Sequence, residues 1–198
     1  MPFVESAYAL GSERIRVQTD CVQKVFKAQR DFMSYVVRCR RPPDEDVTQL
    51  LQETSEALME IEECCDNEAD ERLHLTMVAS GMASMAWVSV PINPSNYISD
   101  MINSIPVYGD KIVKEAAGKE EDERERDIVF VDLFRDMLKG LNEYVRQYHA
   151  KVMTSRACAS SPLWSKISLP LSLTLSSPLS LPLFLSPLIP LLPSFVSL

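Results

Sequence analysis

The chain has 198 residues and a net charge of −8, and its charged residues are distributed unevenly. Residues 1–154 hold all 28 acidic side chains and all but two of the 20 basic ones, the exceptions being Arg156 and Lys166. A stretch of about 150 residues is long enough for one domain with its own core. The acidic balance excludes the basic footprint that binding to nucleic acid or to an anionic membrane requires.

Four helices are expected before the proline loop that Pro91 and Pro94 form. Apolar residues at helical spacing predict a short helix over about 3–10 and a long one over about 12–40, which Pro42 and Pro43 end. A third stripe, from Val47 to Ile61, predicts a helix to about residue 65. The stretch from about 70 to 90 is apolar on nearly every side, so we expect a helix that other helices surround.

Two more helices are expected after this loop. Asn93 can cap and Pro94 can begin a helix that extends to about Val113, with a kink or a break at Pro106. The charge run 119–126 is either a solvated connector or a first helical turn, and a last helix covers about 128–152. No stretch alternates with a period of two, so no sheet is expected. The prediction is an all-α fold, an antiparallel six-helix bundle over residues 1–154.

Residues 155–198 form a different kind of segment. From Pro162 onward, 29 of the 37 residues are Leu, Ser or Pro. A membrane-spanning helix needs about 20 contiguous apolar residues, and seven prolines interrupt this stretch. We therefore expect a disordered tail whose deletion leaves the fold intact. Translated non-coding sequence and a proline-rich ligand for SH3-like modules are both compatible with its composition.

No catalytic or metal-binding motif stands out in the sequence. The five cysteines are odd in number and irregularly spaced, and the N-terminus lacks the pattern of a signal peptide, so reduced intracellular thiols are expected. Cys64, Cys65 and His74 could form a catalytic Cys–His pair, but no third group orients them, and their spacing does not suit zinc. The carboxylates are expected on solvated faces. The pattern favours a binding module over an enzyme, with no cofactor.

Several motifs in order resemble the N-terminal helical domain of the cyclase-associated protein family. They are His74-Leu75, Met85-Ala86-Trp87-Val88, Pro94 with Tyr97-Ile98, Tyr108-Gly109-Asp110-Lys111-Ile112-Val113-Lys114-Glu115, and Leu141-Asn142-Glu143-Tyr144 through His149. Gln29-Arg30, followed by Pro42, also matches the order of the family's motifs. The resemblance covers roughly residues 2–152. It departs from the family in a longer charged run after Lys114, and it lacks the family's N-terminal coiled coil and C-terminal β-helical domain.

The resemblance implies a function in actin dynamics. It implies a cytoplasmic, cytoskeleton-associated module that binds actin together with cofilin and promotes filament disassembly, with a link to adenylyl cyclase. The rival hypothesis is an all-α scaffold for a non-actin signalling partner. Positions that match family motifs suggest a binding surface made of Asn93, Tyr97, Lys111 and Lys114, while Trp87 is expected to anchor the core.

Overall fold

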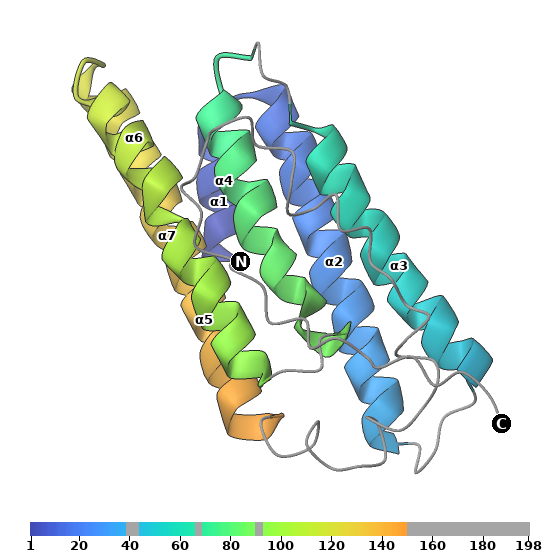
Figure 1. Ribbon diagram of the computed structural model, residues 1–198. Helices are drawn as coiled ribbons and strands as arrows, with labels where there is room; N and C mark the ends of the chain where they lie inside the picture. Colours follow the sequence, from blue (N-terminus) through green and yellow to red (C-terminus); the bar gives the residue numbers. More distant parts are fainter. Residues whose placement is uncertain (39–43, 66–68, 90–92, 150–198) are drawn as a thin grey trace, which may run out of the picture.

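The computed structural model describes residues 1–38, 44–65, 69–89 and 93–149, and these residues form helices and no strand. The helices are α1 (Pro2–Ala9), α2 (Glu13–Arg38), α3 (Asp44–Glu63), α4 (Arg72–Met82), the 3₁₀ helix η1 (Ala83–Ser89), α5 (Pro94–Ser104), α6 (Pro106–Ala116) and α7 (Glu121–Tyr148). Since η1 continues α4 and α6 continues α5, the described chain runs as six helical rods. Apart from the short α1, successive rods alternate in direction (Figure 1).

The predicted antiparallel six-helix bundle is thereby confirmed. The rod of α4 and η1 lies in the middle, with α2 and α3 on one side and α5, α6 and α7 on the other (Figure 1). Its large side chains are fully buried, Leu75, Met77, Met82, Met85 and Trp87 among them. The prediction that this segment is surrounded by other helices is confirmed, because both of its sides face neighbouring rods.

The central rod is helical as predicted, but its last described residues, 83–89, form a 3₁₀ helix instead of an α-helix. From Ala83 the chain tightens into η1. Side chains from two neighbouring helices take backbone carbonyls there: Tyr97 Oη donates to Ala83 O at 3.2 Å, and Gln29 Nε2 donates to Met85 O at 2.8 Å. Carbonyls with tertiary partners depend less on the α-helical ladder, and a 3₁₀ turn is a common way to end a helix.

The break between α5 and α6 lies at the predicted position. Pro106 has no N–H to continue the helical ladder, and Ile105 N–H instead bonds to Ile102 O three residues back, at 3.2 Å. Ile105 itself keeps right-handed helical angles, so the rod continues through the break. Gly109 of α6 then packs against α7, where a larger residue would not fit: a Cβ built on Gly109 would lie 2.9 Å from Val131 Cγ1. This rod thus packs closely along α7.

The charge run proves to be the beginning of α7 and not a separate connector. Glu121, Asp122 and Glu123 occupy its first turn, where negative side chains interact favourably with the helix dipole. The predicted last helix therefore starts about seven residues earlier than its apolar stripe suggested. The predicted tail, residues 155–198, lies outside the described residues, and so do residues 150–152 of the predicted last helix.

Candidate functional site

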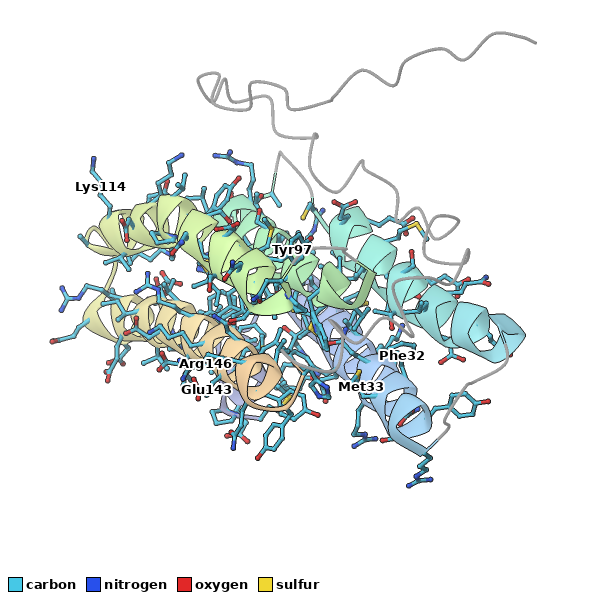
Figure 2. All side chains as sticks on the ribbon, turned by 60° about the horizontal axis from the view of Figure 1, so that its bottom comes forward. Phe32, Met33, Tyr97, Lys114, Glu143 and Arg146 are labelled. Carbon is cyan, nitrogen blue, oxygen red and sulfur yellow. The ribbon has the colours of Figure 1, made fainter. Side chains whose placement is uncertain are left out.

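The four predicted binding residues lie along the rod of α5 and α6, at two separate places. Asn93 caps α5 through its side-chain oxygen, which accepts the Ser95 N–H at 3.0 Å. Tyr97 follows one turn later. Lys111 and Lys114 lie on α6 about 20 Å further along the rod, given 1.5 Å per residue. Figure 2 shows Tyr97 and Lys114 far apart on this rod. The structure therefore makes two small clusters of them and not one contact point.

Tyr97 has a structural task. Its ring is half-buried against the core, and its hydroxyl donates to Ala83 O at 3.2 Å. Burial raises the pKa of this phenol, so it stays protonated and keeps donating at neutral pH. The residue holds α5 against η1, and only its partly exposed edge is available to a partner.

Lys111 and Lys114 are exposed and share one face of α6, three residues apart. Within the described part of the chain neither forms an ion pair, whereas Lys119, a few residues further on, is bound to Asp127. Two exposed cations on an acidic domain are available to an acidic partner. Their role in binding stays a prediction.

One carboxylate that the sequence placed on a solvated face is buried. Asp127 is only 3% exposed; its Oδ1 lies 3.0 Å from His74 Nε2, and its Oδ2 accepts from Lys119 Nζ at 2.8 Å. Burial lowers the pKa of His74, with Asp127 opposing that effect, so the imidazole is neutral and donates from Nε2 at pH 7. A sequence signal exists in retrospect, because Asp127 precedes Phe130, Val131 and Phe134 at helical spacing on the buried face of α7.

Gln29, which the sequence indicated only as part of a family motif, lies at the opposite end of the central rod. The side chain of Gln29 is buried between α2 and η1, where its Oε1 accepts from Trp87 Nε1 at 3.0 Å and its Nε2 donates to Met85 O. His149 packs on the same tryptophan with ring centroids 5.6 Å apart, and burial lowers the pKa of this histidine. Trp87 is 1% exposed. The expectation that Trp87 is a core anchor agrees with this environment.

The described residues form no catalytic or metal-binding constellation. Cys65 Sγ lies 3.5 Å from the Leu75 carbonyl, and His74 is bound to Asp127, so the conceivable Cys–His pair is not formed. Burial raises the pKa of Cys21 to about 11, which leaves little thiolate at neutral pH. No group of three or more potential metal ligands occurs in the described ranges. None of the described helices is long and apolar enough to cross a membrane.

These observations define a class: an all-α domain built from packed antiparallel helical rods. Comparison with known proteins then identifies the family. Residues 1–153 match the family described as "CAP, N-terminal domain", and the chain belongs to that family. The match includes every described helix.

Individual relatives agree with this assignment. The chain is 25% identical over 157 residues to adenylyl cyclase-associated protein 2 of Mus musculus, covering 77% of this chain and 31% of that protein. It is 28% identical over 149 residues to the adenylyl cyclase-associated protein of Hydra viridissima, covering 74% and 30%. The chain thus spans about a third of the length of these relatives.

Solved structures agree in fold. The N-terminal domain of the adenylyl cyclase-associated protein of Dictyostelium discoideum superposes with a TM-score of 0.67 at 20% identity, covering 75% of this chain and 83% of that one. A crystal structure of the N-terminal domain of CAP, described as indicating variable oligomerisation, superposes with a TM-score of 0.68 at 21% identity, covering 76% and 80%. At these identities the likeness concerns the helical bundle itself.

Proposed function

We propose that this chain is a non-enzymatic actin-binding module of the cyclase-associated protein type, which promotes filament disassembly together with cofilin. The observation that carries the proposal is the family match over residues 1–153, which takes in the whole described bundle. It acts by recognition: a rigid helical surface that binds one state of a partner better than another shifts that partner toward the favoured state. This function places it in the cytoplasm, at the cytoskeleton.

The surface proposed for actin is the rod of α5 and α6. It presents Lys111 and Lys114 without internal ion pairs on the described chain, and on the same rod, at a distance, the N-terminal cap Asn93 and the exposed edge of Tyr97. Actin is acidic, so two free cations on an otherwise acidic domain supply local charge complementarity. The distance between the two clusters suits a broad surface of the partner better than a single peptide.

The test is filament disassembly by the full chain with and without cofilin, followed by co-sedimentation with actin. We expect Lys111→Glu with Lys114→Glu to slow disassembly and to weaken binding by about tenfold, because the change opposes charge complementarity. Lys27→Glu with Lys139→Glu reverses the same number of charges on α2 and α7 and serves as the matched control.

Two results would count against the proposal. A folded Lys111 and Lys114 double variant with wild-type activity would remove this surface as the actin contact. No effect of the wild-type chain on actin, with or without cofilin, would refute the actin function itself. The rival hypothesis, a scaffold for another signalling partner, would then be preferred, and the names of the relatives make adenylyl cyclase the first partner to test by pull-down.

A further inference from the structure

The helix α1 shows what the space between α2 and α7 can accept. Phe3 of α1 packs on Phe130 and Phe134 of α7, with ring centroids 5.3 and 5.1 Å apart. At the end of α1, Tyr8 donates a hydrogen bond to Asp20 of α2. The upper part of this space is therefore filled by a short helix that inserts an aromatic side chain.

The space continues beyond α1 as an open groove of about 650 Å³. Along α2 the groove covers successive turns from Phe26 to Arg38. Along α7 it begins at Gly140, about a turn and a half after Phe134. In Figure 2, Met33 of α2 and Glu143 of α7 lie on the two helices that border it. The lining residues are Phe26, Gln29, Arg30, Met33, Ser34, Arg38, Trp87, Gly140, Leu141 and Tyr144.

The lining has an apolar floor and a basic rim. Trp87, Met33 and Leu141 lie buried at the bottom of the groove, and the accessible apolar surface comes from the half-buried Phe26 and from Tyr144, which is 46% exposed. Arg30 and Arg38 are the charged residues among the described lining residues, and none of these carries a carboxylate. Arg30 lies 3.7 Å from Asp31, a loose and exposed contact that leaves most of its hydrogen-bond donors free. On a chain with a net charge of −8, this rim is locally opposite in sign.

Gly140 keeps the groove open. A glycine in the middle of a helix costs about 0.5–1 kcal/mol relative to alanine. Gly81 has a reason within the fold, because a Cβ there would lie 2.6 Å from the Phe134 ring. A Cβ at Gly140 would meet nothing within 4 Å. The bundle does not need this glycine, and its missing side chain leaves room in the groove.

From this combination we propose that the groove between α2 and α7 binds an amphipathic helix of a partner protein, with apolar anchors against Phe26 and Tyr144 and acidic residues facing Arg30 and Arg38. The stretch from Phe26 to Arg38 is about 18 Å long, the length of a three-turn helix. The groove thus repeats, for a partner, the helix-in-groove packing that α1 makes within the chain. This proposal is independent of actin binding by α5 and α6.

Charge favours a partner over the chain's own C-terminal segment. Residues 155–198 contain no acidic residue, and their only charges are Arg156 and Lys166. Such a segment offers nothing to the arginine rim, whereas an acidic amphipathic helix satisfies both the floor and the rim.

The test uses the full chain and a fluorescein-labelled synthetic peptide of about 14 residues, with Leu and Phe at i, i+3, i+4 and i+7 and Glu at the flanking positions. We expect micromolar binding in fluorescence anisotropy. Gly140→Leu, which fills the groove, and Arg30→Glu with Arg38→Glu, which reverses the rim, should each weaken binding at least about tenfold. The same peptide with Lys in place of Glu should not bind.

The matched control is Lys111→Glu with Lys114→Glu, an equal charge change on another face, which should leave peptide affinity within about twofold. Circular dichroism verifies that each variant is folded, and methionine-methyl NMR should show a shift of Met33 and none of Met101. Equal binding by wild type and Gly140→Leu, or no binding of the acidic peptide, would overturn the proposal. So would self-association of the chain that Gly140→Leu abolishes, because the occupant would then be a second copy.

Discussion

The two ends of the central rod each bury one histidine, and they do so in opposite ways. At the beginning of α4, His74 lies in a charged network with Asp127 and Lys119. At the other end, His149 packs against Trp87 and Tyr144 by ring contacts, and neither of its ring nitrogens has a hydrogen-bond partner in the described chain. One end is fixed by ionic hydrogen bonds and the other by aromatic packing.

The two ends also differ in the space beside them: the cavity at the charged end measures about 340 Å³, against about 650 Å³ for the groove at the aromatic end. The charged end ties α4 to α7 through the contacts of Asp127 with His74 and Lys119, although Nδ1 of His74 has no hydrogen-bond partner in the described chain. The aromatic end lies beneath the groove, where Tyr144 is exposed and Gly140 leaves space. Substitutions at the charged end should therefore change stability alone, whereas substitutions at the aromatic end should change stability and binding together.

The largest effect is expected at the aromatic end. Trp87→Ala removes a fully buried side chain and the hydrogen bond to Gln29 Oε1, and should cost about 3–5 kcal/mol in free energy of unfolding. Chemical denaturation measures this value, with Trp87→Phe, which keeps an aromatic ring but loses the indole N–H, as the comparison. An unchanged melting temperature in Trp87→Ala would contradict the core assignment.

A smaller loss is expected at the charged end. Asp127→Ala leaves the buried His74 Nε2 without its acceptor and should cost about 1.5–3 kcal/mol. Peptide binding at the groove should stay at wild-type affinity, which is the readout that separates the two ends. Asp127→Asn retains an acceptor for His74 and should lose less. Weaker groove binding in folded Asp127→Ala would mean that the ends are coupled.

Both buried histidines should make the stability of the bundle depend on pH, and a variant of one of them separates their contributions. Burial lowers the folded-state pKa of both below the ordinary value of 6.5, so in mildly acidic solution the unfolded chain binds more protons. Their contribution to stability is thus complete above about pH 6.5 and is lost as the pH falls through the folded-state values. His149→Phe should reduce the drop in melting temperature between pH 7 and pH 5, and His74 should contribute to the drop that remains. An identical pH profile in this variant would exclude His149 as a contributor.

The smallest effect is a gain in stability. Gly140→Ala should raise the free energy of unfolding by about 0.5–1 kcal/mol, because the new methyl group meets nothing and the helix loses a flexible residue. Gly81→Ala is the opposite control, since its Cβ would collide with Phe134 and destabilise the packing of α4 on α7. Thermal unfolding of both variants decides this; a loss of stability in Gly140→Ala would mean that the groove is not open at this position.

Much of the bundle was determined by local sequence. Apolar spacing predicted the rods because one face of each helix must be buried, and Pro106 marked the break in the α5–α6 rod because it lacks an N–H. The apolar character of the segment around Met77 and Met82 placed it in the centre for the same reason. The order of motifs along the chain is likewise local, and it agrees with the family that residues 1–153 match.

Tertiary structure alone decided the features that depend on distant partners. The carbonyls of η1 bind Gln29 and Tyr97, and the acceptor of His74 is Asp127, 53 residues away. The groove likewise arises because α1 ends its cover of α2 and α7 before Gly140, and none of the described helices lies above that glycine. Periodicity reports which face of a helix is apolar, but a hydrogen bond or a groove between two helices depends on how far apart their axes lie, which no single segment encodes.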